Sequence, residues 1–172
     1  MGMLIKKKNV GLKPIINGGR STTVYRSGTP NVPGIAATAF ALKKAIENQK
    51  QRYEYAKKLN KKIIDYIKQY DFMHINNTEA SMPFTINFSI KGIKSQDVVD
   101  YFSSKEIYLS SKTSCCPIGT PSKLIYALTK DKSLASTSIR LSVSHTTTKE
   151  EIDEFIEVLD DYLKELKNNG KI

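Results

Sequence analysis

Two short segments alternate strictly between apolar and polar residues, and this alternation limits most strongly what the chain can fold into. Residues 84–90 read FTINFSI and residues 137–144 read TSIRLSVS. A period of two residues predicts β-strands with one face toward a core and one polar face. In the second segment Ile139 and Leu141 are expected to face the core, which turns Arg140 to the polar side.

Helical patterns that could cover the core face flank these strands. Apolar residues recur at helical spacing in 35–46 and in 50–70, which predicts either one long helix or two helices with a bend near Asn48. Pro33 suits the first turn of such a helix. Closer to the C-terminus, Thr148 opens the capping-box sequence TKEE, so a helix is expected to start there.

Shorter elements complete the predicted order. Residues 3–16 are expected to form a short strand, a turn and a second extended piece, and residues 106–110 another short strand. Ser95 can cap a short helix, and residues 122–129 have a helical pattern. From residue 72 onward the order is strand, strand, helix, strand, loop, helix, strand, helix. This order predicts a small α+β sandwich, a sheet with helices on one face.

Composition narrows the possible environments of the chain. Its 172 residues carry a formal net charge of +10, which favours an acidic partner. The lysines are spread over helix faces without a nucleic-acid-binding motif, so nucleic-acid binding is not expected. No stretch has the roughly 18 apolar residues that cross a bilayer, and the N-terminus is not expected to be a signal peptide or a membrane anchor. Two adjacent cysteines cannot form a disulfide framework, which predicts the reducing cytosol.

Both cysteines, Cys115 and Cys116, lie in a polar, turn-forming segment, SSKTSCCPIGTPS (residues 110–122). A thiol is reactive as thiolate at an accessible, electropositive site, and Lys112 is close in the sequence. The opposite interpretation, two small core residues, stays open because free cysteine is among the most buried residue types. Metal binding is not expected, since adjacent thiols with His145 distant in the sequence do not give ligand spacing.

Two further stretches carry candidate groups. Arg140 offers a rigid fork for a carboxylate or, alternatively, a surface ion pair with a neighbouring acid. The loop of residues 17–34 contains Arg20, Arg26, small residues and hydroxyls. It suits either phosphate binding through backbone N–H groups or an ordinary long connection. It contains no GxxxxGK[ST] or GxGxxG, so it is not a standard nucleotide loop.

Four stretches in order resemble the C-terminal part of the cysteine desulfurases, pyridoxal-phosphate enzymes of the class V aminotransferase group. They are GGRSTTVYRSGTPN, SSKTSCC, TSIRLSVS and TTTKEEID, at compatible spacing over nearly the whole chain. The resemblance implies the small C-terminal domain of a fold-type I enzyme, with an antiparallel-rich sheet preceded by a long helical connection. Residues 1–48 would be the end of the large cofactor domain, and residues 49–172 the small domain with the cysteine loop.

Carried over residue by residue, the resemblance implies specific roles. Cys115 matches the nucleophile that attacks the sulfur of L-cysteine and becomes a persulfide, with L-alanine as the other product. Arg140 matches the arginine that holds the substrate carboxylate. Thr29 matches a hydroxyl that reaches the cofactor phosphate of the partner subunit in a homodimer, and Arg26 lies in the same phosphate-contact loop. Cys116 stands where the family usually has another small residue.

The resemblance also implies what this chain lacks. The family's Schiff-base lysine lies upstream of the matched region, so this chain alone is expected to be inactive. The complete enzyme would need pyridoxal phosphate, L-cysteine and a sulfur-acceptor protein, for example in iron–sulfur cluster assembly in the cytoplasm. The alternative is a non-catalytic desulfurase-like module that binds a partner or relays persulfide sulfur. Thr22, Thr23 and Val24 replace the family's Glu-Arg-Gly, and Lys112 and Cys116 also depart from the family's loop. These departures leave the substrate open between cysteine, a selenium analogue and another compound.

Overall fold

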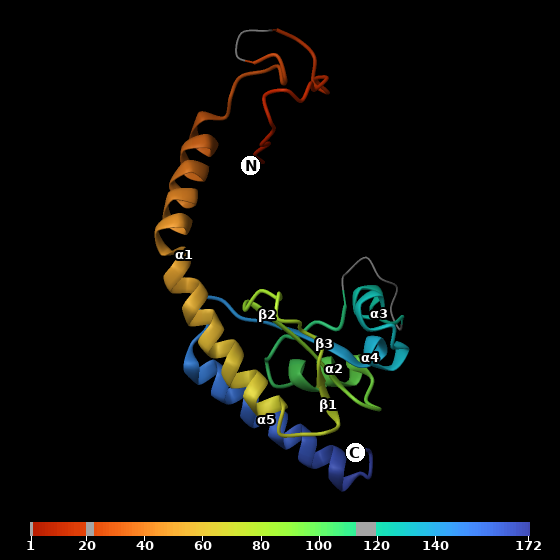
Figure 1. The fold of residues 1–172 in the computed structure, drawn as a ribbon. Coiled ribbons are helices and arrows are strands. Elements are labelled where there is room, and N and C mark those ends of the chain that lie inside the picture. The colour runs from red at the N-terminus through yellow and green to blue at the C-terminus, as the bar shows by residue number, and fades with distance from the viewer. Residues whose placement is uncertain (1, 20–22, 113–119) are drawn as a thin grey trace. The chain divides into compact units, whose positions relative to one another are not determined.

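The computed structural model of the protein describes residues 2–19, 23–112 and 120–172. The chain divides into two compact units, residues 1–49 and 50–172. Figure 1 gives the labels of the helices and strands. No helix within the described ranges is long and apolar enough to cross a membrane.

The first unit consists of extended and turn backbone followed by the start of a long helix. The strand expected within residues 3–16 does not form, because no second strand among the described residues of this unit pairs with it. Helix α1 (Val32–Ile67) begins next, and Asn31 Oδ1 accepts a hydrogen bond of 3.0 Å from the Gly34 backbone N–H. Pro33 lies in the first turn, as predicted, where a missing N–H leaves no intrahelical bond unmade.

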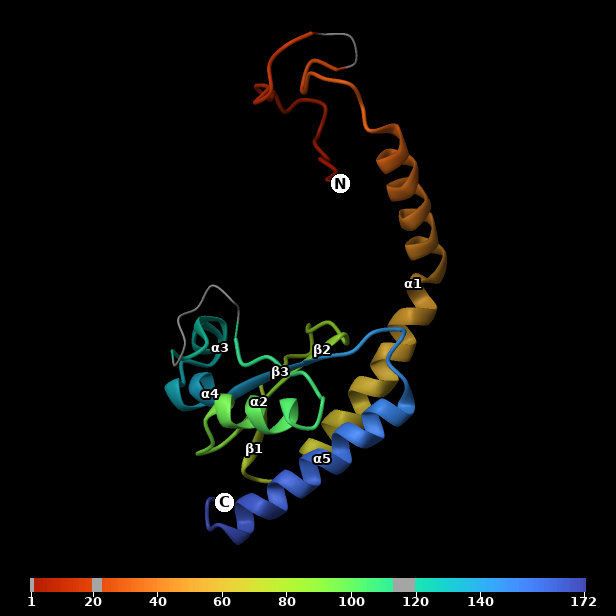
Figure 2. The same cartoon turned by 180° about the vertical axis from the view of Figure 1, so that it is seen from behind.

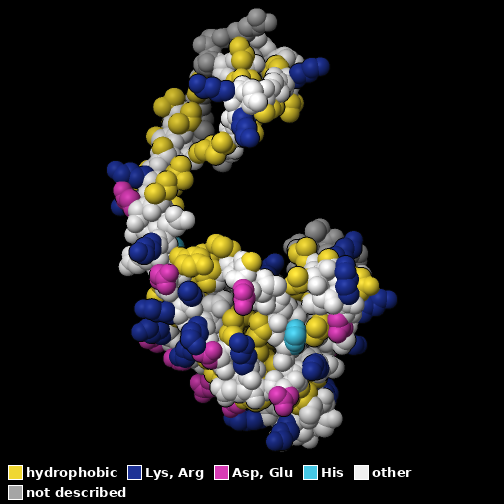
Figure 3. All heavy atoms as spheres, viewed as in Figure 1, with side chains coloured by type: hydrophobic (Ala, Val, Ile, Leu, Met, Phe, Trp, Pro, Cys, Tyr) yellow, Lys and Arg dark blue, Asp and Glu magenta, His cyan; other side chains and the backbone are white. Residues whose placement is uncertain are grey.

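The two helical patterns on either side of Asn48 form this one helix. Its first half leaves the predicted apolar stripe uncovered: Ile35 is 46% exposed, and Phe40 and Ile46 are each 64% exposed. Figure 3 shows hydrophobic side chains gathered along this part of the helix. None of the described residues before Ala56 is buried. The described part of the first unit therefore has no hydrophobic core of its own.

The second unit is built on an antiparallel sheet in the order β1–β2–β3 (Figure 1). The strands are β1 (Met73–Ile75), β2 (Thr85–Ile90) and β3 (Ser138–Ser142). Ile86 lies opposite Leu141, and Phe88 lies opposite Ile139. All four side chains are buried, which confirms the core faces predicted from the alternation.

Three helices cover the apolar face of this sheet. They are the second half of α1, α2 (Ser95–Ser103) and α5 (Lys149–Asn168). Their buried side chains form one cluster with the apolar residues of the strands. The burial of this cluster is the main source of stability for the second unit, because apolar area removed from water is the dominant favourable term in folding.

Helix α5 lies alongside the second half of α1 in both views of the ribbon (Figures 1 and 2). The Tyr55 hydroxyl donates to the Thr147 carbonyl at 2.8 Å, and the Tyr66 hydroxyl donates to Asp160 Oδ1 at 3.2 Å. The earlier residue of α1, Tyr55, contacts a residue just before α5, and the later one, Tyr66, contacts a residue within α5. The two helices therefore run in the same direction.

The polar face of the sheet also contacts a helix, which corrects the expectation of helices on one face only. Helices α3 (Lys123–Thr129) and α4 (Lys132–Thr137) precede β3. Ser89 lies on the polar face of β2, and its Oγ donates to the Leu134 carbonyl of α4 at 3.0 Å. Helix α4 was not predicted, because its six residues are too few to show a helical repeat of apolar side chains. The helix starts after Asp131, whose carboxylate caps its N-terminus.

Two helix starts were predicted from capping residues, and one of them is confirmed. At α5, Thr148 Oγ1 accepts from the Glu151 N–H at 3.1 Å, and Glu151 Oε2 accepts from the Thr148 N–H at 2.7 Å. At α2 the prediction was wrong, because Ser95 is the first helical residue rather than the cap. The N-cap there is Lys94, whose side chain makes no capping hydrogen bond.

Replacing Thr148 by alanine should lower the free energy of unfolding by about 1 kcal/mol, because the Glu151 N–H loses its acceptor. The Ser95→Ala variant is the control, and its unfolding free energy should stay within about 0.5 kcal/mol of the wild type. Urea unfolding followed by far-UV circular dichroism measures both. Equal losses in the two variants would contradict the assignment of the caps.

Replacing Phe102 by alanine should cost about 3–5 kcal/mol, because large-to-small changes in a core leave a cavity. Its ring is fully buried and lies 5.4 Å from that of Phe155, centroid to centroid. The matched control is Phe40→Ala on the exposed stripe, with an expected change of no more than about 0.5 kcal/mol. The same unfolding experiment decides, and a large loss from Phe40→Ala would mean that the stripe is covered within this chain.

Candidate functional site

A row of polar residues crosses the sheet on the face away from the core. Asn87 of β2 lies opposite Arg140 of β3. Arg140 and Ser110 exchange two backbone hydrogen bonds. The Arg140 N–H donates to the Ser110 carbonyl at 2.6 Å, and the Ser110 N–H donates to the Arg140 carbonyl at 3.0 Å. On the other side the Asn76 backbone N–H donates to the Asn87 carbonyl at 2.8 Å. We call these four residues the polar row.

The strand expected at residues 106–110 does not form, and only Ser110 of this segment pairs with the sheet. It makes an isolated bridge to Arg140, beyond β3. The bridge extends the sheet by one residue pair at this edge. It therefore fixes the backbone of Ser110 next to Arg140, although no regular strand is present.

The Arg140 side chain is half-buried on the polar face, where the alternation predicted it. Its guanidinium makes no hydrogen bond or ion pair with the residues that the structure describes. The surface ion pair that was the alternative interpretation is thus not formed in this part of the chain. A half-buried guanidinium without an acceptor offers its planar fork of N–H donors to a carboxylate or another oxyanion.

Hydrogen bonds from Asn76 hold the side chain of Asn87. Asn76 is 5% exposed, and its Nδ2 donates to Asn87 Oδ1 at 2.8 Å and to Ser89 Oγ at 2.9 Å. The Asn87 backbone N–H donates to Asn77 Oδ1 at 2.6 Å. Asn76 Oδ1 accepts no hydrogen bond from the described residues, and an unpaired buried acceptor costs about 1–3 kcal/mol. The orientation of Asn76 is thus determined by its two donated bonds.

Residues 113–119, which include Cys115 and Cys116, lie outside the described residues. The described residues that flank them are held by backbone hydrogen bonds. Ser110 is bound to Arg140, and after the gap the Ser122 N–H donates to the Ala135 carbonyl at 2.8 Å. The chain therefore enters the cysteine segment beside the polar row.

The first unit carries the loop predicted to contact a phosphate. Arg26 folds back along this loop, and its Nη1 donates to the carbonyls of Gly28 at 3.2 Å and Thr29 at 3.3 Å. Gly28 has a φ of 101°, and a Cβ there would lie 3.3 Å from Arg26 Nη1, so glycine suits this position best. Arg26, Gly28 and Asn31 are among the residues that line a cavity of about 530 Å³. Arg20 lies outside the described residues.

The residues of this loop fit a phosphate group. Thr29 is exposed, and its hydroxyl makes no hydrogen bond within the described chain. Helix α1 starts three residues later and has no acidic side chain in its first turn. A cation, an open hydroxyl and a nearby helix N-terminus together attract an anion. The hydrogen bond from Arg26 to the Thr29 carbonyl keeps the two residues together in this loop.

Asn76, Asn87 and Ser110 were not among the predicted site residues. The alternation in FTINFSI already places Asn87 on a polar face, as it does Arg140. Nothing in the sequence reveals that these two residues lie opposite each other, because strand register depends on contacts across the sheet. The bridge of Ser110 to Arg140 joins segments that are far apart in the sequence and could not be predicted for the same reason.

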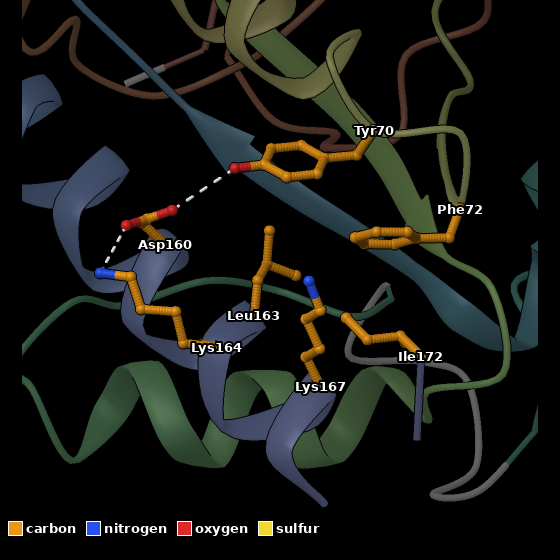
Figure 4. A pocket seen from close by; sticks show the side chains of 7 residues that line it. All are labelled: Tyr70, Phe72, Asp160, Leu163, Lys164, Lys167 and Ile172. Carbon is orange, nitrogen blue, oxygen red and sulfur yellow. Dashed lines mark hydrogen bonds and ion pairs between the residues drawn. The ribbon is translucent and has the colours of Figure 1, made fainter. Parts of the chain in front are cut away.

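A second, mainly apolar cavity of about 330 Å³ lies between Tyr70, Phe72 and the last turns of α5 (Figure 4). At its edge the Tyr70 hydroxyl donates to Asp160 Oδ1 at 3.4 Å, and Lys164 Nζ lies 2.7 Å from Asp160 Oδ2. The hydrogen bond from Lys164 lowers the pKa of Asp160 below its usual range. Burial raises the pKa of Tyr66 well above its usual range, so its hydroxyl stays a donor to the same carboxylate.

The lowered pKa of Asp160 predicts how stability depends on pH. Its ionised form stabilises the folded state, fully so above the ordinary Asp pKa of about 4, and this contribution is lost as the pH falls through the lower folded-state pKa. An Asp160→Asn variant should therefore be less stable than the wild type at neutral pH and equally stable in strong acid. Urea unfolding across the acid range measures this, with Asp71→Asn as the control for net charge. A stability difference that persists in acid would contradict the assignment.

Residues 14–155 match the family Aminotransferase class-V. The chain is 30% identical over 165 residues to a NifS/IcsS protein homolog of Lactobacillus delbrueckii subsp. bulgaricus, a match that covers 94% of this chain and 43% of that protein. It is 28% identical over 167 residues to the mitochondrial cysteine desulfurase of Saccharomyces cerevisiae, covering 94% of this chain and 33% of the relative. The chain thus spans about a third to two fifths of the length of these relatives.

Solved structures of NifS-like proteins share its fold. A NifS-like protein superimposes with a TM-score of 0.77 at 28% identity, over 92% of this chain and 40% of that one. A NifS-like protein from Rickettsia africae gives a TM-score of 0.75 at 29% identity, over 91% and 41%. The chain therefore belongs to the class-V aminotransferase family, and its relatives in that family are cysteine desulfurases and NifS-like proteins.

Proposed function

We propose that the chain is the C-terminal portion of a pyridoxal-phosphate-dependent cysteine desulfurase. In this proposal Cys115 accepts sulfur from L-cysteine as a persulfide, and Arg140 holds the carboxylate of that substrate. The observation that carries the proposal is the half-buried Arg140, which has no acceptor among the described residues and is bound through its backbone to Ser110. Ser110 lies five residues before Cys115, a length of chain that spans at most about 18 Å.

In the proposed sulfur transfer this chain supplies the nucleophile. The Cys115 thiolate attacks the sulfur of bound L-cysteine, so that an S–S bond forms and the substrate's Cβ–S bond breaks. The electron pair of the broken bond goes to the substrate carbon, which takes up a proton and leaves as L-alanine. Pyridoxal phosphate, when bound, supplies the electron sink for this cleavage. Arg140 contributes by orienting the substrate, so that its sulfur is presented to the thiolate.

The cofactor would be held by the loop in the first unit. Thr29 and Arg26 are the residues here that would contact its phosphate, with Thr29 reaching the cofactor of the partner subunit in a homodimer. The exposed hydroxyl of Thr29 and the fold of Arg26 over Gly28 support this role. Residues 1–48 then belong to the large cofactor domain, and residues 49–172 form the small domain of a fold-type I enzyme.

We infer that the isolated chain does not turn over cysteine, because the lysine that anchors the cofactor lies in the preceding part of the enzyme. The exposed stripe with Ile35, Phe40 and Ile46 supports this inference, since apolar residues at helical spacing are expected to be covered in the complete protein. The persulfide would pass to a sulfur-acceptor protein, as in iron–sulfur cluster assembly. A thiolate nucleophile needs a reducing compartment such as the cytoplasm.

The role of Cys115 is tested in the complete enzyme with L-cysteine as substrate. Cys115→Ser should reduce alanine and sulfide formation by roughly a thousandfold or more, because the persulfide can no longer form. Cys116→Ser is the matched control and should retain most of the activity. Mass spectrometry of the wild type should find the added sulfur on Cys115. Normal turnover by Cys115→Ser would refute the proposal.

The isolated chain tests the inference that it lacks the cofactor-anchoring lysine, an inference that the proposal shares with its alternative, a non-catalytic module. Pyridoxal phosphate and L-cysteine are added to the purified chain, and cofactor absorbance and sulfide are recorded. Neither a Schiff-base band nor sulfide is expected. If a Schiff-base band and sulfide release both appear, a lysine within this chain anchors the cofactor, and our assignment of the missing part is wrong.

A further inference from the structure

We propose that Asn87 is a second donor for the substrate carboxylate, beside Arg140. The inference rests on the proposed function, since it assigns a further residue to the same substrate site. In it the Asn87 side-chain amide donates one N–H to the carboxylate that the guanidinium holds. The two strands β2 and β3 would then each supply one donor group to the same ligand.

The pairing of the strands brings the two side chains together. In an antiparallel sheet the backbone N–H and C=O of a residue point to the same neighbouring strand. Those of Arg140 point to Ser110, and the carbonyl of Asn87 accepts from Asn76 on the opposite side. Asn87 and Arg140 are therefore a non-hydrogen-bonded pair. In such a pair the Cα atoms are only about 4.5 Å apart and the side chains on one face approach closely.

Asn76 determines which way the Asn87 amide points. Its Nδ2 holds Asn87 Oδ1 at 2.8 Å, so the carbonyl end of that amide faces β1. Since the amide is planar, with its oxygen and nitrogen on opposite sides of Cγ, Nδ2 of Asn87 is turned away from β1. Asn76 uses both of its own amide hydrogens on Asn87 and Ser89, and its Oδ1 stays unpaired among the described residues. Asn76 therefore acts only as a donor here, and its bond to Oδ1 keeps the Asn87 amide in this orientation.

Both donor groups lack an acceptor. Asn87 Nδ2 and the Arg140 guanidinium make no hydrogen bond with the described part of the chain, and both side chains are half-buried. Other polar groups on this face are engaged, as Ser89 Oγ donates to the Leu134 carbonyl. A carboxylate has two oxygens and about four acceptor positions. It can accept from the guanidinium and from the amide together, and its two oxygens match the planar fork of the guanidinium better than a spherical anion does.

The test uses the full 172-residue chain, labelled with ¹⁵N, and sodium acetate as the probe. The side-chain NH₂ signals of Asn87 and the Nε–H signal of Arg140 are followed by NMR during the titration. Sodium chloride at equal concentration controls for charge and ionic strength. The signals of both groups should shift with acetate along the same saturation curve. Chloride at equal concentration should not cause these shifts.

Two variants sharpen the experiment. Asn87→Leu keeps the approximate shape of the side chain without its donors, and the acetate affinity measured at Arg140 should fall roughly tenfold, as for loss of one charge-assisted hydrogen bond. Thr85→Val is the matched control, because Thr85 lies on the same strand and face, opposite Ser142 instead of Arg140. Its acetate affinity should stay within about twofold of the wild type.

Each outcome decides the inference. If Arg140 shifts on acetate addition and Asn87 does not, or if Asn87→Leu binds acetate as the wild type does, the second donor is refuted while the role of Arg140 stands. If neither group shifts, the carboxylate site is refuted as a whole. Should Asn87→Leu fail to fold, the wild-type titration alone still decides. The sulfur-accepting role of Cys115 is tested independently by turnover and mass spectrometry.

Discussion

The antiparallel pairing of β2 with β3 is the constraint on which the rest of the second unit depends. It places Ile86 and Leu141 together in the core and Asn87 and Arg140 together on the opposite face. A slip of one residue would exchange the two sets of side chains. It would bury a guanidinium without a partner, which is far more costly than leaving it half-exposed. The hydrophobic contacts of the core thereby also determine where Arg140 lies.

The polar row gives the candidate site a rigid base. Asn87 and Arg140 belong to neighbouring strands, and Ser110 is joined to Arg140 by two backbone hydrogen bonds. The segment that carries the cysteines continues from this base. Such a division would suit the proposed desulfurase, in which groups on a sheet hold the substrate and the nucleophile belongs to a connecting segment.

The two units differ in how far their residues are buried. The second unit has a continuous core formed by its strands and by α1, α2 and α5. In the first unit none of the described residues is buried, although its helix has an apolar stripe. A helix of this kind gains most of its stability from packing. The difference supports the proposal that the first unit belongs to a domain that this chain contains only in part.

Much of the second unit follows from local sequence. The alternation in FTINFSI and TSIRLSVS determined the strand faces, and TKEE determined the start of α5, because side-chain period and capping act over a few neighbouring residues. Only the tertiary structure decided that Asn87 lies beside Arg140, that Ser110 binds the edge of β3, and that α4 contacts the polar face. These contacts join segments far apart in the chain, and their register depends on how the complete core packs.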